Sequence, residues 1–192
     1  METAKKIRIA ILIVLIVCAA VFMTLKLTGR IGISEDEISD IYVVNYKDKA
    51  EELLGTRVSV DGISTVSNDD IPSLHTGLVY LDDRTEGEYF IYYKPKGIYF
   101  GWHLLKEGKI TKDDKIKEFD CGEYGTAYVS LNYNYMINAI KYTDGRAIDP
   151  EDVGKENTYY DIKYVIAENS MKPIVFYDKD GKEIETEMEE VL

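Results

Sequence analysis

The chain has 192 residues and a formal net charge of −12, from 23 Lys and Arg against 35 Asp and Glu. Its 45% hydrophobic content and two cysteines exclude an intrinsically disordered chain and a disulfide-stabilised scaffold. The acidic balance argues against nucleic acid as a partner, because phosphate contacts need clustered Lys and Arg. The length allows one ordinary domain.

An apolar run near the N-terminus predicts a transmembrane helix at residues 9–27. No charged residue occurs from Ile9 to Leu25, and the run has roughly the 20 residues that a helix needs to cross a bilayer. It is longer than the core of a cleaved signal peptide and ends in a poor cleavage site. A lipoprotein signal ending at Cys18 fits less well, because Val17 is not small and the run continues past the cysteine.

Charges beside the apolar run predict its orientation. Residues 1–30 carry five cations and one acid, a net charge of +4, and residues 31–192 carry 18 cations and 34 acids, a net charge of −16. Three cations precede the run and two follow it: Lys5, Lys6, Arg8, Lys26 and Arg30. This excess favours a cytoplasmic N-terminus at residues 1–8, with the rest of the chain outside the cell membrane.

The cysteines and the missing glycosylation signal favour a bacterial cell envelope. Cys18 falls inside the predicted span, which leaves Cys121 without a partner for a disulfide in the outer domain. The sequence also has no Asn-x-Ser/Thr acceptor.

A juxtamembrane segment and a short amphipathic helix are predicted within residues 28–54. Ser34 and Glu37 have the spacing of a capping box, and apolar residues follow at helical intervals up to Leu54. The helix is expected over Glu35–Leu54, with a potential break at residues 43–45.

The remaining residues, 55–192, predict an extracytoplasmic β-rich domain, so that the fold class is α+β. The expected arrangement is a small antiparallel sheet or a partly open barrel. Residues 108–117 are expected to be an exposed connection, and residues 132–142 fit a helix and a strand equally well. Strand patterns occur at residues 58–63, 77–81, 89–93, 98–100, 126–131, 158–167, 173–177 and 183–188.

Residues 50–63 read Ala-Glu-Glu-Leu-Leu-Gly-Thr-Arg-Val-Ser-Val-Asp-Gly-Ile, and a later strand pattern ends in Asp82-Asp83. This arrangement resembles the opening of OB-fold domains, in particular the anticodon-binding-like domains of anchored bacterial proteins. The resemblance implies an OB-like start to the domain. It does not imply nucleic-acid binding, because the basic, aromatic strand face of such domains is absent.

Aromatic residues between positions 89 and 103 provide the candidate binding site. Aromatic rings beside carboxylates can stack on sugars, so an envelope glycan or an envelope protein is the candidate partner. The alternative is that these rings fill the core of the sheet. The candidate ligand-binding residues are Tyr92, Tyr99, Trp102 and His103.

No catalytic residue, metal site or cofactor is predicted. Cys121 lies among acidic residues, which disfavour a thiolate, and the two histidines are His75 and His103. The Asp178–Gly181 segment begins like a calcium-binding loop, but it fits a hairpin turn better. The acidic run from Glu183 to Glu190 predicts a solvated strand face or, alternatively, a patch for a basic partner.

Together these features predict a non-enzymatic, membrane-tethered binding or protein-interaction module of the cell envelope. The alternative is a structural or regulatory subunit of a membrane complex that is recruited through its single span. An envelope hydrolase is the least favoured function, since the sequence lacks a catalytic motif.

Overall fold

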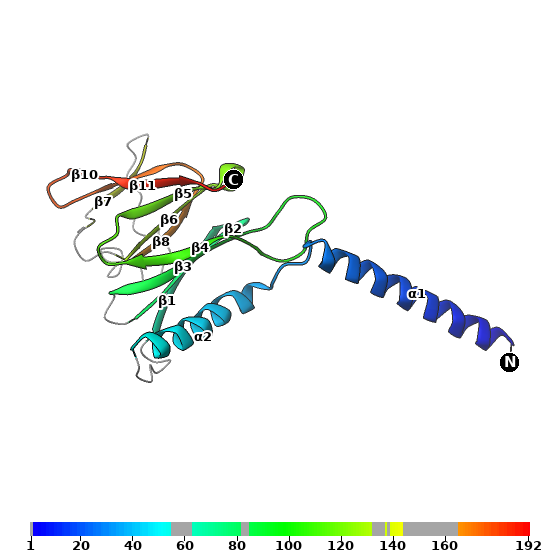
Figure 1. The fold of residues 1–192 in the computed structure, drawn as a ribbon. Helices are drawn as coiled ribbons and strands as arrows, with labels where there is room; N and C mark the ends of the chain where they lie inside the picture. The colour runs from blue at the N-terminus through cyan, green and yellow to red at the C-terminus, as the bar shows by residue number, and fades with distance from the viewer. Residues whose placement is uncertain (1, 55–62, 82–84, 132–136, 138, 144–164) are drawn as a thin grey trace.

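The computed structural model describes residues 2–54, 63–81, 85–131, 137, 139–143 and 165–192. The N-terminal helix α1 (Glu2–Leu27) stands apart from the rest of the chain (Figure 1). Within α1, Lys6–Leu27 is long and apolar enough to cross a membrane, and none of it is packed inside the domain. The predicted apolar span is therefore a continuous, unpacked helix.

The second helix, α2 (Glu35–Leu54), has the predicted bounds and runs unbroken through residues 43–45. The Glu37 carboxylate accepts hydrogen bonds from the Ser34 main-chain nitrogen at 3.0 Å and from the Ser34 hydroxyl at 2.9 Å. One face of α2 is buried through residues spaced four apart: Ile38, Tyr42 and Tyr46. This spacing places the three side chains on one side of the helix.

Three sheets form the rest of the described structure. The first is antiparallel in the order β1-β2-β3-β4 and comprises β1 (Ile63–Ile71), β2 (Leu74–Leu81), β3 (Glu86–Tyr93) and β4 (His103–Thr111). The second has the order β11-β5-β6-β8 and comprises β11 (Thr186–Glu190), β5 (Ile116–Asp120), β6 (Thr126–Leu131) and β8 (Val165–Ser170). The third has the order β10-β9-β7 and comprises β10 (Glu183–Ile184), β9 (Ile174–Tyr177) and β7 (Ala139–Tyr142). A short 3-10 helix, η2 (Gly122–Tyr124), lies between β5 and β6.

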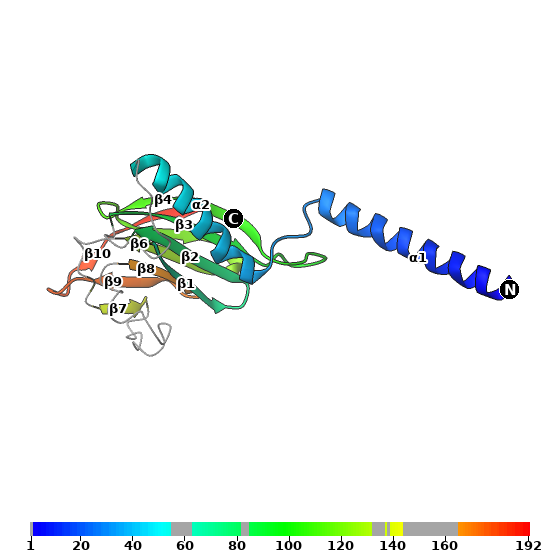
Figure 2. The same cartoon turned by 90° about the horizontal axis from the view of Figure 1, so that it is seen from below.

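These elements stack as layers around three apolar clusters. The first two sheets pack face to face through residues such as Leu78, Ile91, Phe119 and Val129. On the outer face of the first sheet, α2 packs against Val79, Phe90, Tyr92 and Trp102. On the outer face of the second sheet, Tyr128 packs against Phe176 of the third sheet. Figure 2 accordingly has α2 on one side of the domain and β7 on the opposite side.

The β-rich fold and the antiparallel pairing of most described strands are as predicted, but the arrangement differs from the small antiparallel sheet or partly open barrel that was expected. The described strands form three open sheets, and β11 pairs with β5 in parallel. The reason is that β2 and β6 are buried along their whole length, and a strand buried on both faces needs a covering layer on each side. The OB-like start stays a prediction, because residues 55–62 lie outside the described residues.

Several strand predictions are confirmed and others are corrected. Residues 126–131 and most of 173–177 form strands, and Gly181 turns the next hairpin with a φ of 75°. The strand expected at residues 98–100 is a loop, because its glycine neighbours Gly97 and Gly101 both have positive φ.

Two further corrections concern the charged segments. Residues 108–117, expected to be an exposed connection, include the last residues of β4 and the first residues of β5. Ile110 and Ile116 are buried there, between more exposed polar neighbours. The expected strand at residues 183–188 divides at Glu185 into β10 and β11, which join different sheets. Residues 139–142 of the ambiguous segment form a strand, and residues 165–167 of the strand expected at 158–167 belong to β8, whereas residues 132–136 and 158–164 lie outside the described residues.

Candidate functional site

The segment that follows α1 pairs with the long loop between β3 and β4, and we call these residues, 28–34 and 94–102, the junction. The Phe100 nitrogen donates to the Arg30 carbonyl at 2.9 Å, and the Gly32 nitrogen donates to the Phe100 carbonyl at 2.7 Å. Trp102 and Ile33 exchange two further main-chain hydrogen bonds, of 2.8 and 3.0 Å. This short ladder fixes the loop beside the end of α1 (Figure 1).

Two glycines allow the close approach of the two junction segments. A Cβ atom at Gly32 would lie 2.0 Å from the Trp102 carbonyl oxygen. A Cβ atom at Gly101 would lie 2.7 Å from the Ile33 carbonyl oxygen, and Gly101 also has a φ of +77°. Both positions therefore require glycine for the ladder to form.

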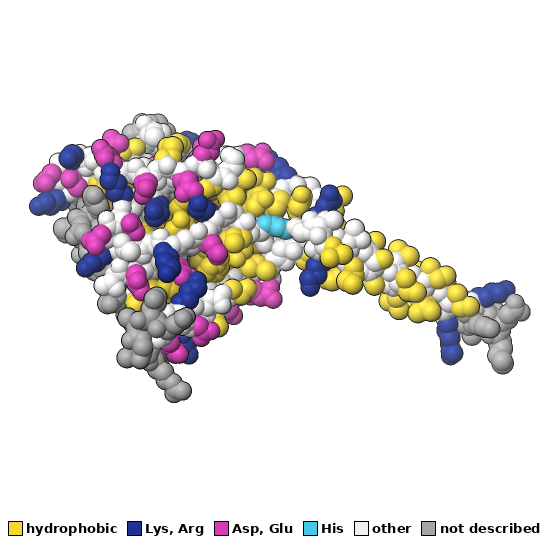
Figure 3. All heavy atoms as spheres, in the orientation of Figure 1, with side chains coloured by type: hydrophobic (Ala, Val, Ile, Leu, Met, Phe, Trp, Pro, Cys, Tyr) yellow, Lys and Arg dark blue, Asp and Glu magenta, His cyan; other side chains and the backbone are white. Residues whose placement is uncertain are grey.

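The loop tip carries exposed apolar and aromatic side chains. Ile98 is 65% exposed and Phe100 is 55% exposed, and Tyr99 is also exposed. The Arg30 guanidinium lies 5.6 Å from the centre of the Tyr99 ring. Figure 3 has hydrophobic side chains along α1 and also over the part of the domain next to α1. The tip thus continues the apolar surface of α1 onto the domain.

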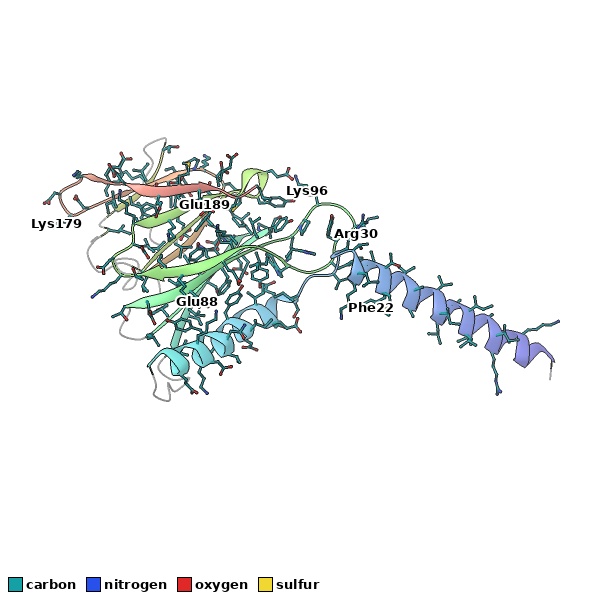
Figure 4. The ribbon with its side chains drawn as sticks, in the orientation of Figure 1. Phe22, Arg30, Glu88, Lys96, Lys179 and Glu189 are labelled. Carbon is teal, nitrogen blue, oxygen red and sulfur yellow. The ribbon has the colours of Figure 1, made fainter. Side chains whose placement is uncertain are left out.

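Basic side chains border this apolar tip. Lys96 pairs with Glu123 of η2, and the Lys94 ammonium nitrogen lies 4.1 Å from the centre of the Trp102 ring. Arg30 and Lys96 lie near the end of α1 in Figure 4, whereas Lys179 lies at the far end of the domain.

The four predicted ligand-binding residues differ in their exposure. Exposed Tyr99 of the junction lies beside half-buried His103 at the start of β4, with ring centres 5.6 Å apart. Trp102 is 3% exposed and Tyr92 is buried beneath α2, where its hydroxyl lies 3.3 Å from the Tyr42 hydroxyl. The structure therefore does not bring the four rings onto one exposed surface.

Three side chains that could ligate a metal ion lie close together next to Trp102. Ligand atoms of Glu35, Asp69 and His75 all lie within 4.8 Å of one another, and the His75 ring centre lies 5.6 Å from that of Trp102. Glu35 and Asp69 are exposed, whereas His75 is buried. One imidazole and two carboxylates are a donor set that a divalent metal ion can use.

The electrostatics of this group favour a neutral imidazole. Burial lowers the pKa of His75, and the nearby Lys94 ammonium lowers it further, while Asp69 and Glu35 act in the opposite direction. Within the described part of the chain, neither ring nitrogen of His75 has a hydrogen-bond partner.

Sequence reasoning missed this group because its members come from three elements. Glu35 opens α2, Asp69 lies near the end of β1, and His75 lies at the start of β2. Their positions match no metal-binding motif. The short separation of Asp69 and His75 in the sequence would have been a weak signal.

The buried thiol of Cys121 does not have the properties of a nucleophile. It donates a hydrogen bond of 3.5 Å to the Phe119 carbonyl, and burial raises its pKa to about 12. The thiol therefore stays protonated near pH 7, whereas catalysis by cysteine requires the thiolate.

Comparison with protein families, with curated proteins and with solved structures finds no match for this chain. A functional proposal must therefore come from the residues themselves.

Proposed function

We propose that this chain is a single-pass membrane protein and a non-enzymatic binding module of the cell envelope. In this proposal α1 spans the membrane with its N-terminus in the cytoplasm, and the junction holds the domain against the outer surface of the membrane. The observation that carries the proposal is the main-chain ladder between residues 30–33 and 100–102. It fixes an apolar loop tip within a few residues of the end of α1.

The chemistry of the loop tip suits the interface of a bilayer. Moving the exposed side chains of Ile98 and Phe100 out of water is favourable by about 25 cal/mol for each Å² of apolar surface. Tyr99 has the amphipathic ring that is enriched at membrane interfaces, and Arg30 beside it can reach lipid headgroups.

The strongly acidic domain gives the junction a further role. Residues 31–192 carry a net charge of −16, which an anionic membrane surface repels. Cations of the junction, together with Lys26 at the end of α1, oppose this repulsion on the side of the domain next to the span: Arg30, Lys94 and Lys96. A domain held in one orientation presents the same surfaces to its neighbours, as a tethered interaction module requires.

The proposal can be tested with tryptophan as a depth probe, because Trp102 is the single tryptophan of the chain. In a Trp102→Phe background, three full-length variants each receive one new tryptophan, at Phe22, Ile98 or Lys179. The proteins are placed in vesicles with and without brominated lipids, which quench tryptophan at short range. We expect quenching for Phe22→Trp and Ile98→Trp, and none for Lys179→Trp.

The three positions separate the parts of the proposal. Unquenched Phe22→Trp would contradict the anchor. Quenched Phe22→Trp with unquenched Ile98→Trp would contradict the contact between the domain and the membrane.

The binding role is tested by replacing residues 9–25 with an unrelated apolar sequence of equal length. A module that binds through its domain should give the same crosslinked species in cells as the parent chain. Loss of these species on exchange of the span would contradict the module and favour a subunit recruited through α1.

A further inference from the structure

Three donor groups from separate elements meet at one point beside the junction. Because ligand atoms of Glu35, Asp69 and His75 lie within 4.8 Å of one another, a common point exists within about 2.8 Å of all three. Metal bonds from such atoms are about 2.0–2.2 Å long. The two carboxylates are on exposed side chains, so they can close this small difference by rotation.

The His75 ring provides independent evidence for a ligand. The side chain is 5% exposed, and neither ring nitrogen has a hydrogen-bond partner among the described residues. Buried polar groups are almost always paired, so an imidazole in this state lacks something to bind. The exposed side chains of Glu35 and Asp69 each bring a carboxylate oxygen within 4.8 Å of a ring nitrogen of His75.

The charge balance of the site also suits a cation, since Glu35 and Asp69 supply two carboxylates beside the His75 ring. Lys94 is close enough to act on His75, but its ammonium lies over the Trp102 ring. The two carboxylates together carry more charge than this one ammonium.

We propose that Glu35, Asp69 and His75 bind a divalent transition-metal ion, with Zn²⁺ as its representative. A mixed set of one nitrogen and two oxygens suits Zn²⁺ better than Ca²⁺, which takes six to eight oxygen ligands. The bound ion would link the first turn of α2 to the β1–β2 hairpin, close to Trp102 of the junction. This site goes beyond the proposed function, and either can fail without the other.

The test uses the full chain in lipid nanodiscs after treatment with a chelator. We expect calorimetry to show about one Zn²⁺ per chain, as for a single site. Glu35→Gln and Asp69→Asn should each weaken binding roughly tenfold or more, since each removes a charged ligand. Asp36→Asn and Asp70→Asn are matched controls on the neighbouring residues, and they should bind like the parent.

A second measurement reports directly on the position of the ion. Co²⁺ at this site would lie close to Trp102 and quench its fluorescence, and this quenching should be lost in His75→Phe. Absence of stoichiometric Zn²⁺ binding by the parent would overturn the proposal. Equal weakening by the control variants would overturn it as well. If His75→Phe does not fold, the two surface substitutions still decide the outcome.

Discussion

The side-chain amide of Asn169 on β8 donates a hydrogen bond of 2.6 Å to the main-chain carbonyl of Asn68 on β1. The same amide donates to the Leu74 carbonyl at 2.9 Å, and its oxygen accepts a hydrogen bond from the Thr76 hydroxyl. Asn169 is buried, so one side chain joins the second sheet to both strands of the β1–β2 hairpin. This hairpin carries Asp69 and His75.

Asn169→Ala should destabilise the domain by about 2–4 kcal/mol, because it leaves buried polar groups of the hairpin without partners. The measurement is chemical unfolding of the full chain in detergent micelles, followed by the fluorescence of Trp102. Asn45→Ala on the exposed face of α2 is the control and should change stability by less than about 0.5 kcal/mol. Equal effects of the two substitutions would contradict the role of Asn169.

Glu168, the neighbour of Asn169, should make stability depend on pH. Burial, with a smaller contribution from Asp70, raises the pKa of Glu168 from its ordinary 4.5 to about 8. The folded chain therefore binds more protons than the unfolded chain between these values, and the free energy of unfolding falls as pH rises through this window.

Glu168→Gln removes this ionisation from the folded and unfolded chains. We expect the variant to exceed the parent in stability at pH 8 by roughly 2–4 kcal/mol, and to show little gain near pH 4.5. Unfolding measured from pH 4.5 to 8 checks this, with Glu190→Gln as the exposed control. A parallel pH dependence in Glu168→Gln and the parent would show that Glu168 does not titrate as described.

Gly32→Ala should release the loop of the junction, because the added methyl group would collide with the Trp102 carbonyl. Trypsin cleavage after Lys96 measures this release, and we expect it to be roughly tenfold faster than in the parent. The control is Gly29→Asn, since a side chain at Gly29 meets nothing within 4 Å and Asn tolerates its positive φ. Unchanged cleavage in Gly32→Ala would mean that the ladder does not hold the loop.

Local patterns made α1 and α2 predictable from the sequence. The apolar run of α1 and the Ser34–Glu37 capping pair of α2 each lie in one short, continuous segment. The sequence of that segment alone is therefore enough to predict the helix. The same holds for the turn at Gly181.

The arrangement of the sheets depended on contacts between distant residues. The acidic residues in and next to β11 are predicted from the sequence to form a solvated strand face. In the structure they pair with lysines that are distant in the sequence: Lys115 with Glu185, Lys117 with Glu187, and Lys106 with Glu189. No local pattern encodes the parallel register of β11 on β5. Likewise, Glu35, Asp69 and His75 meet only after α2 packs on the first sheet.

The orientation of the chain in the membrane can be tested with cysteine chemistry. Cys18 lies within the proposed span and Cys121 is buried, so the parent chain should resist a membrane-impermeant maleimide in intact cells. Lys179→Cys adds a thiol at an exposed turn at the far end of the domain. If the domain is outside, this variant should be labelled in intact cells.

A reciprocal variant completes the test. Thr3→Cys adds a thiol before the span and should react only after the membrane is permeabilised, because the cations before the apolar run favour a cytoplasmic N-terminus. Labelling of Thr3→Cys but not Lys179→Cys in intact cells would reverse the orientation. Removal of α1 by a signal peptidase would instead yield a shortened Lys179→Cys chain that is labelled but no longer sediments with membranes.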